Sequence, residues 1–272
     1  MSDPRITPVN ARVAAAHLPG AAPNLRRVTP EPLRVTRPVV DLLRAPGGAR
    51  DRQLLWGEAV DRYEDHQGIS FVQARRDGYV GYLSSDALGP ERAATHWVSA
   101  PATHAYAAAD IKSPDRHMLS FGSRLTALSE TEKFIETDAG FVPRAHLHPI
   151  NGRLDDPVAV AELFIGTPYL WGGNSRSGID CSGLVQAALL ACAHPCPGDT
   201  DMQETEVGHR ANESPQRGDL LFWKGHVALV VDVDTILHAN AFHMAVSYEP
   251  MRAAIARIQD QGDGAVTAHK RL

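Results

Sequence analysis

The chain of 272 residues has few cysteines, no long apolar run and no signal-peptide pattern in its first residues. Its three cysteines are Cys181, Cys192 and Cys196. This low, odd number does not make a disulfide framework, and it suits a reducing compartment in which a thiol stays free to react. No apolar run approaches the ~20 residues of a membrane-spanning helix. The N-terminus lacks the basic start and apolar core of a signal peptide. We therefore expect a cytoplasmic protein without a membrane partner.

The chain also lacks a strong excess of either charge. Its formal net charge is −5, with 22% charged and 43% hydrophobic residues. A mildly acidic chain is a poor match for nucleic acid or an anionic membrane, so neither is expected as a partner. The hydrophobic fraction is typical of a globular protein, and the length exceeds one typical domain.

The first half of the chain predicts an arm and a small all-β domain. Residues 1–35 are rich in proline and arginine and show little periodicity, which predicts an irregular N-terminal arm. In residues 36–90, the run Ile69–Ala74 alternates apolar and polar residues, as in a half-buried strand. Asp77-Gly78 predicts a hairpin turn into a return strand. Short strands at this spacing predict an SH3-like barrel over residues 36–90.

Residues 91–150 repeat the same pattern. A turn followed by Gly140-Phe141-Val142 corresponds to Gly81-Tyr82-Leu83 in the preceding segment. The repeat predicts an internal duplication of roughly 60 residues. We therefore expect a second SH3-like barrel over residues 91–150.

Residues 151–272 predict a third unit that contains helices as well as strands. Asp156 is a suitable N-cap and Pro157 a suitable first residue for a short helix. An apolar helical pattern runs from residue 181 to about 192. Apolar runs at 227–231 and 236–241 predict two strands. The unit is therefore expected to be α+β.

Cys181 lies where a reactive thiol is expected. It follows Asp180, a suitable N-cap, and opens the helical pattern. Unpaired backbone N–H groups and the helix dipole favour a thiolate at this position. A cysteine taken alone is more often a buried structural thiol, and the position at the helix start is what shifts the interpretation.

Two histidines downstream of Cys181 strengthen this interpretation. His226 and His238 lie in the two strand-like runs, on either side of Asp232-Val233-Asp234. If those three residues form a hairpin turn, the histidines lie opposite or nearly opposite each other on one face of the hairpin. One imidazole then acts as a base while the other sets its tautomer and orientation.

These motifs together resemble the NlpC-type, papain-like cysteine peptidases, which cut bacterial cell-wall peptides. The resemblance covers nearly all of residues 151–250. The two barrels resemble the bacterial SH3-like domains joined to such domains in γ-D-glutamyl-L-diamino acid endopeptidases. The resemblance of residues 151–250 to the peptidases rests on these segments: Tyr169-Leu170-Trp171-Gly172-Gly173, Asp180-Cys181-Ser182-Gly183-Leu184-Val185, Arg217-Gly218-Asp219-Leu220, Gly225-His226-Val227-Ala228-Leu229 and His238-Ala239. The expected fold is a papain-like α+β catalytic domain, residues 151–272, preceded by two small all-β SH3-like barrels.

The resemblance implies roles for particular residues. Cys181 would be the nucleophile, His226 the general base and His238 the orienting third member. The backbone N–H of Cys181 would form part of the oxyanion hole, with Tyr169 beside it. Asp180 and Ser182 would bind the free N-terminal amine of the substrate, a role that competes with capping for Asp180.

The resemblance also implies substrate contacts from the first barrel, which closes one end of the cleft in these enzymes. Glu58 is the candidate that holds the amine, against the alternative of a solvated turn residue. Tyr79 or Tyr82 would supply a hydroxyl, and alternation along the strand lets at most one of them face the cleft. Cys192 and Cys196 lack further ligands at a metal spacing, so no metal or other cofactor is expected.

The resemblance therefore implies a cysteine endopeptidase of cell-wall peptide recycling. Its substrate would be a murein-derived peptide, L-Ala-γ-D-Glu-diamino acid, cut after the γ-D-glutamyl residue. One alternative is a secreted peptidoglycan hydrolase that acts on intact murein. Another is a non-catalytic module that binds cell-wall peptides.

Overall fold

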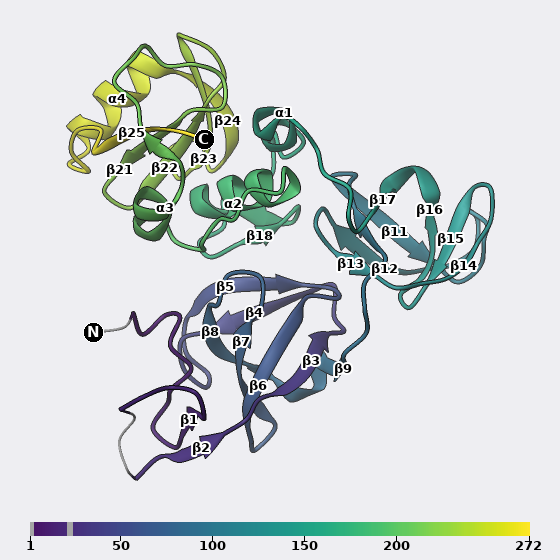
Figure 1. Cartoon of the computed structure of the whole chain (residues 1–272). Coiled ribbons are helices and arrows are strands. Elements are labelled where there is room, and N and C mark those ends of the chain that lie inside the picture. Colours follow the sequence, from purple (N-terminus) through teal and green to yellow (C-terminus); the bar gives the residue numbers. More distant parts are fainter. Residues whose placement is uncertain (1–2, 21–23) are drawn as a thin grey trace. The chain divides into compact units, whose positions relative to one another are not determined.

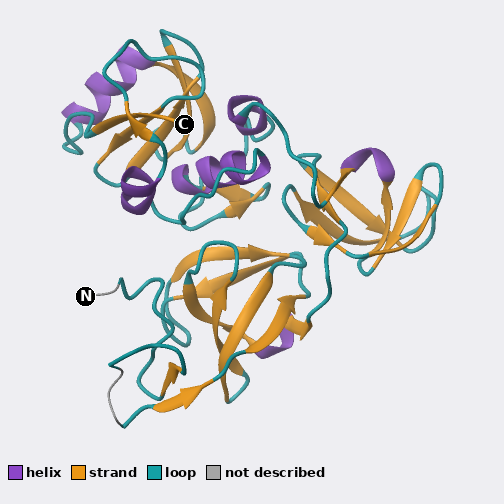
Figure 2. Cartoon of the chain, viewed as in Figure 1, coloured by secondary structure: helices purple, strands orange, loops and turns teal. Residues whose placement is uncertain are grey.

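The structure is a computed structural model that describes residues 3–20 and 24–272. The chain divides into two compact units, Met1–Asn151 and Gly152–Leu272. Figure 1 follows the elements along both units. Strands dominate the first unit, whereas the second combines a sheet with helices (Figure 2). This is the α+β domain with preceding all-β domains that the sequence predicts.

The first unit contains a seven-stranded antiparallel sheet in the order β5-β4-β8-β7-β6-β3-β9. Within the described residues, no ladder joins β5 to β9, so the sheet is open. Gly78 has a φ of 76° in the predicted turn between β7 and β8. The apolar core includes Leu42, Leu54 and Val72. The strands are β3 (Glu31–Val35), β4 (Val39–Leu43), β5 (Arg50–Leu55), β6 (Ala59–His66), β7 (Ile69–Ala74), β8 (Val80–Ser84) and β9 (Leu88–Pro90).

Two smaller sheets follow, in the orders β13-β10-β17 and β12-β11-β16-β15-β14. Val98, Leu119 and Val142 lie in their shared core, together with Trp56, which directly follows β5. The strands are β10 (His96–Val98), β11 (Ala102–Tyr106), β12 (Asp115–Ser120), β13 (Arg124–Leu125), β14 (Ala127–Glu130), β15 (Phe134–Thr137), β16 (Gly140–Pro143) and β17 (Leu147–Pro149).

The two halves of this unit share one topology, which supports the predicted duplication. Strand β8 leads through the 3₁₀ turn Ser85–Ala87 into β9, and β16 leads through Arg144–His146 into β17. Strand β9 pairs with β3, and β17 pairs with β10. Strand β4 pairs with β8, and β11 pairs with β16 in the same antiparallel way. We call the two halves the first and second copy.

Close contacts join the two copies. Gly57 has a φ of 74°, and a Cβ at this position would lie 1.9 Å from the carbonyl oxygen of Arg124. The Asp138 carboxylate of the second copy accepts hydrogen bonds from the Arg34 guanidinium and, at 3.4 Å, from Trp56 Nε1. The copies are therefore packed through backbone contact and a buried ion pair.

The N-terminal arm packs on the first sheet. It contains the parallel strands β1 (Val13–Ala15) and β2 (Arg26–Val28). Val13 and Ala15 form an apolar cluster with Tyr63 and Phe71. Arg12 Nε donates to Glu64 Oε1 at 2.8 Å. The predicted arm is thus partly regular in its described residues.

The second unit has a six-stranded antiparallel sheet in the order β20-β25-β21-β22-β23-β24. Helix α2 lies against β22 and β23, and α4 packs on this sheet through Met251, Ala254 and Ile258. The elements are α1 (Pro157–Glu162), β18 (Asn174–Ser175), β19 (Gly178–Ile179), α2 (Cys181–Ala191), α3 (Thr200–Glu206), β20 (His209–Arg210), β21 (Leu220–Trp223), β22 (His226–Val230), β23 (Thr235–Asn240), β24 (Ala245–Pro250), α4 (Met251–Asp260) and β25 (Ala268–Arg271).

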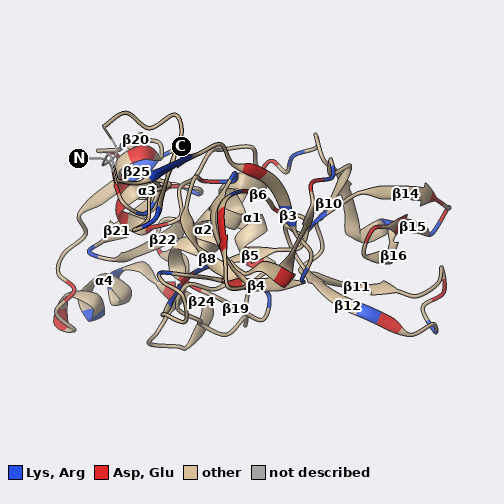
Figure 3. Cartoon of the chain, turned by 90° about the horizontal axis from the view of Figure 1, so that it is seen from below, with Lys and Arg blue, Asp and Glu red and all other residues tan. Residues whose placement is uncertain are grey.

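Acidic and basic residues are interspersed along the ribbon of Figure 3, without a long segment of one sign. Among the described residues, no helix combines the length and apolar character needed to cross a bilayer.

Candidate active site

Cys181 is the first residue of α2, with Asp180 as N-cap. Cys181 is 6% exposed, and its Sγ lies 4.0 Å from the carbonyl oxygen of Gly225. Gly225 directly precedes His226, the first residue of β22. The helix start therefore brings the thiol to the head of the strand that carries the predicted base.

The Asp180 carboxylate ties the helix to the glycine-rich segment before it. Oδ1 accepts from the backbone N–H of Gly183 at 2.7 Å and from Ser182 Oγ at 3.1 Å. Oδ2 accepts from the backbone N–H of Gly172 at 2.8 Å. These contacts cap the helix and fix the neighbouring backbone at the same time.

Gly183 lets that segment approach α2 closely. A Cβ on Gly183 would lie 2.5 Å from the carbonyl oxygen of Gly173. The chain's own backbone therefore fills the space beside Gly183.

The two histidines lie on one face of the hairpin β22–β23, in a diagonal arrangement. The ladder pairs Leu229 with Leu237 and Val230 with Ile236. Continued outward, this register sets His226 across from Asn240, two residues along from His238. Diagonal neighbours stay within reach of aromatic side chains. His226 Nε2 and His238 Nδ1 are 2.8 Å apart.

The contacts continue past His238 to two residues that the sequence did not predict. His238 Nε2 lies 3.0 Å from Glu249 Oε2 on β24. Arg257 on α4 donates to Oε1 of Glu249 from Nε at 2.9 Å and to Oε2 from Nη2 at 2.7 Å. We call His226, His238, Glu249 and Arg257 the histidine relay. No motif spacing marks Glu249 or Arg257, because strand pairing and helix packing bring them to the histidines.

Burial dominates the electrostatics of the relay. It lowers the pKa of His226 to about 3, with added effects of His238 and Arg257. It also lowers the pKa of His238 to about 4, although Glu249 opposes this shift. Burial would raise the pKa of Glu249, but hydrogen bonds from Arg257 and His238 outweigh it and the net shift is downward. At neutral pH the relay thus holds two neutral imidazoles and an ionised carboxylate.

The other predicted residues of this unit lie close to Cys181. Burial raises the pKa of Tyr169, and the nearby charges of Cys181 and Asp180 raise it further. Its phenol therefore stays protonated and can donate a hydrogen bond. Ser182 is buried, and its carbonyl oxygen accepts from Gln203 Nε2 at 3.0 Å. The structure thus brings Asp180, Ser182 and Tyr169 to the start of α2.

Glu58, Tyr79 and Tyr82 lie in the first unit. Glu58 is 4% exposed rather than solvated, and Arg76 Nη1 donates to its Oε1 at 2.6 Å. Its Oε2 is buried and has no hydrogen-bond partner among the residues that the structure describes. Burial raises the pKa of Glu58, and Arg76 opposes the shift.

The two tyrosines occupy different surroundings. Tyr79 is 4% exposed in the apolar core of the first sheet. Tyr82 is half-buried and packs on the cluster under the N-terminal arm, with its ring centroid 5.1 Å from that of Phe71.

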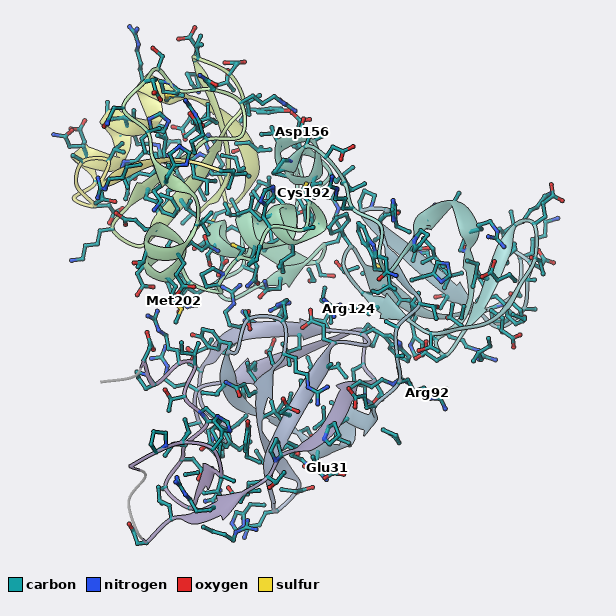
Figure 4. The ribbon with its side chains drawn as sticks, in the orientation of Figure 1. Glu31, Arg92, Arg124, Asp156, Cys192 and Met202 are labelled. Atoms are coloured by element: carbon teal, nitrogen blue, oxygen red, sulfur yellow. The ribbon has the colours of Figure 1, made fainter. Side chains whose placement is uncertain are left out.

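Neither remaining cysteine resembles a metal ligand or a reactive thiol. Burial raises the pKa of Cys192 to about 11, and nearby Asp156 and Asp155 add to the shift (Figure 4 labels Cys192 and Asp156). Cys196 is buried as well. His238, His243 and Glu249 have possible ligand atoms within 4.8 Å of one another. Because Arg257 occupies both oxygens of Glu249, we interpret this group as an ion pair and not as a cation site.

The fold and the site combine a thiol at a helix start with two histidines in hydrogen-bond contact, in an α+β domain preceded by all-β domains. Residues 166–260 match the model of the NlpC/P60 family, and residues 42–88 match that of the bacterial dipeptidyl-peptidase Sh3 domain. The chain thus contains an NlpC/P60 peptidase domain preceded by a bacterial dipeptidyl-peptidase SH3 domain.

Named relatives agree with this assignment. The chain is 28% identical over 213 residues to a gamma-D-glutamyl-L-lysine dipeptidyl-peptidase of Bacillus subtilis, a match that covers 69% of this chain and 71% of the relative. It is 39% identical over 87 residues to dipeptidyl-peptidase 6 of Lysinibacillus sphaericus, covering 32% of each chain. This shorter match spans about a third of that relative's length.

One solved structure supports the fold. An NlpC/P60 family protein from Bacillus cereus superposes with a TM-score of 0.75 at 18% sequence identity, covering 89% of this chain and 99% of that one. At this identity the likeness concerns the fold alone.

Proposed function

We propose that the protein is a cysteine endopeptidase that cuts murein-derived peptides after a γ-D-glutamyl residue. The observation that carries this proposal is the position of Cys181, at a helix N-terminus and 4.0 Å from the residue before His226, whose imidazole is in turn held by His238. The similarity to a gamma-D-glutamyl-L-lysine dipeptidyl-peptidase supports the class of bond.

The reaction proceeds through an acyl-enzyme. His226 takes the proton of the Cys181 thiol, and Sγ attacks the γ-carbonyl carbon of D-Glu. The backbone N–H of Cys181, at the helix start, and the Tyr169 hydroxyl stabilise the oxyanion. His226 then protonates the amine of the departing diamino acid, which leaves a thioester. Water, deprotonated by His226, releases L-Ala-γ-D-Glu and regenerates the thiol.

The substrate has a free N-terminal L-Ala in this proposal. Asp180 and Ser182 bind its ammonium. In the first unit, taken by itself, Glu58 is the candidate carboxylate for an amine and Tyr82 the candidate hydroxyl, because Tyr79 is part of the core. The support for Glu58 is its buried Oε2, to which no group of the described residues donates. An unpaired buried carboxylate oxygen is costly, and an ammonium would satisfy it. At the matching position of the second copy the chain has Ser123, so the fold itself does not need a carboxylate there.

A requirement for a free amine suits peptides already released from the glycan, because a stem peptide attached to the glycan has its L-Ala amine blocked. We therefore place the activity in the recycling of cell-wall peptides in the cytoplasm. A hydrolase of intact murein is the competing function, and a free-amine requirement separates the two.

The test compares L-Ala-γ-D-Glu-diaminopimelate, its N-acetylated form and intact murein as substrates, with Cys181→Ala as the control. We expect the wild type to cut only the free peptide, with kcat/KM for the acetylated form lower by roughly 100-fold or more, since burying an unpaired charge costs several kcal/mol. Equal cleavage of the acetylated peptide refutes the free-amine requirement. If wild type and Cys181→Ala are equally inert on all three, the protein is not this peptidase.

A further inference from the structure

His238, the second histidine of the relay, is held by a charged pair from two other elements. Glu249 lies on β24, directly across the ladder from Ile236 on β23, and its side chain is 8% exposed. Arg257 lies in the last turn of α4, and its guanidinium lies 4.4 Å from the centre of the Phe242 ring. The pair is therefore fixed from three sides: the sheet, the helix and the turn before β24.

We propose that Glu249 and Arg257 are positioning residues that set the tautomers of His238 and His226 and so leave Nδ1 of His226 unprotonated as the base. The consequence for catalysis rests on the proposed function, whereas the tautomers themselves do not.

The argument follows the hydrogen bonds inward from Glu249. An ionised carboxylate only accepts, so at 3.0 Å the Nε2 of His238 must carry the proton. A neutral His238 then has a lone pair on Nδ1, which accepts at 2.8 Å from Nε2–H of His226. A neutral His226 with its proton on Nε2 has its lone pair on Nδ1. Glu249 thus decides, through two bonds, which nitrogen of His226 can take a proton.

Arg257 keeps Glu249 in the state that this arrangement needs. Its two hydrogen bonds reach both carboxylate oxygens and hold the plane of the group. Without the guanidinium, burial would favour a protonated Glu249, which could donate to His238 and reverse both tautomers. The position of the Arg257 guanidinium beside the Phe242 ring further restricts the Arg257 side chain.

Stability alone does not account for this pair. Buried ion pairs stabilise folds little more than well-packed apolar residues of similar size. What a carboxylate supplies and an apolar residue does not is a fixed acceptor for Nε2–H. The pair acts through His238 and has no contact with the thiol among the described interactions.

The experiment reads the tautomers directly by ¹⁵N NMR of the histidine rings in the full chain. In the wild type at pH 7, both His238 and His226 are expected to carry the proton on Nε2. In Glu249→Gln, Arg257 attracts the amide oxygen and turns the NH₂ toward His238, whose Nε2 must then accept. We expect both tautomers to reverse in this variant.

Kinetics supply the second readout. A wrong histidine tautomer lowers kcat by about 10⁴ in the serine protease triad, and we expect a loss of at least 100-fold in kcat for Glu249→Gln, with KM changed less than about threefold. Arg257→Lys retains one cationic donor and should keep the wild-type tautomers with a smaller loss. Ser247→Ala, on the same strand across from His238, is the matched control and should change neither readout.

Two results would overturn the proposal. One is a wild-type His238 with its proton on Nδ1, a measurement that needs no variant to fold. The other is a Glu249→Gln protein with wild-type tautomers or wild-type kcat. The NMR result does not depend on whether the peptide is cleaved. It therefore tests the role of Glu249 and Arg257 even if the proposed peptidase activity is absent.

Discussion

At the scale of single residues, Asp180 shows how one carboxylate serves two backbone segments. Its oxygens accept from Gly183 and Ser182 in the helix and from Gly172 before it. In the sequence analysis, capping of the helix and binding of the substrate were competing roles for this residue. A carboxylate has about four lone-pair sites, so capping does not by itself preclude a further donor. Asp180 can therefore cap the helix and contact an ammonium.

The buried histidines predict a loss of stability in acid. Their pKa values are about 3 and about 4 in the folded protein, below the ordinary 6.5. At a pH between the folded and the unfolded pKa values, the unfolded chain binds more protons than the folded protein. The free energy of unfolding therefore falls as pH drops from about 6.5 toward 3. At pH 5 the loss should be roughly 2 kcal/mol per histidine, since one pKa unit corresponds to about 1.4 kcal/mol.

Guanidinium unfolding between pH 7.5 and 4.5 measures this loss. The double variant His226→Asn/His238→Asn should show a much smaller dependence on pH over that range. His194→Asn, a change at an exposed histidine of the same unit, should retain the wild-type dependence. Parallel curves for the wild type and the double variant would mean that the relay histidines are not the groups that titrate.

At the scale of elements, the hairpin was predictable and its supports were not. The separation of His226 from His238 and the turn residues between them put both histidines on one face, because side chains alternate along a strand. The actual register makes them diagonal rather than opposite. Glu249 and Arg257 lie beyond a second turn, on the next strand and a following helix. Their approach depends on the pairing of β23 with β24 and on helix packing, which no local pattern encodes.

Alanine substitutions at two equivalent glycines, one in each copy, should lower the stability by different amounts. Gly57 and Gly122 occupy matching positions in the two copies, with φ values of 74° and 86°. A Cβ at Gly57 would lie 1.9 Å from Arg124 O, whereas at Gly122 the nearest atom, in Leu55, is 3.6 Å away. Gly122→Ala should lose roughly 1–2 kcal/mol for positive φ alone.

Gly57→Ala should lose roughly 3 kcal/mol or more, because a clash with backbone adds to the strained φ. Guanidinium unfolding followed by tryptophan fluorescence compares the two variants. Equal losses for Gly57→Ala and Gly122→Ala would show that the contact with Arg124 relaxes at little cost.

At the scale of the whole molecule, the duplication was visible in the sequence, but the way the copies join was not. Repeated turn and aromatic residues indicated two similar domains. The join consists of Trp56 in the core of the second copy and of Asp138 bound to Arg34. Arg34 and Asp138 are separated by more than a hundred positions, and each has the sequence context of an ordinary surface charge. Only the packed structure shows that their side chains are 9% and 2% exposed.

This buried pair predicts how the first unit unfolds. Asp138→Ala leaves the Arg34 guanidinium buried without its carboxylate, which should cost roughly 3–5 kcal/mol. Because the pair spans the two copies, calorimetry should show their unfolding separating into two steps, where the wild type unfolds this unit in one. The double variant Arg34→Met/Asp138→Leu replaces the charges with apolar groups, and it should recover most of the stability because a well-packed apolar pair matches a buried ion pair. If Asp138→Ala unfolds like the wild type, or the double variant is no better than the single one, the ion pair does not couple the copies.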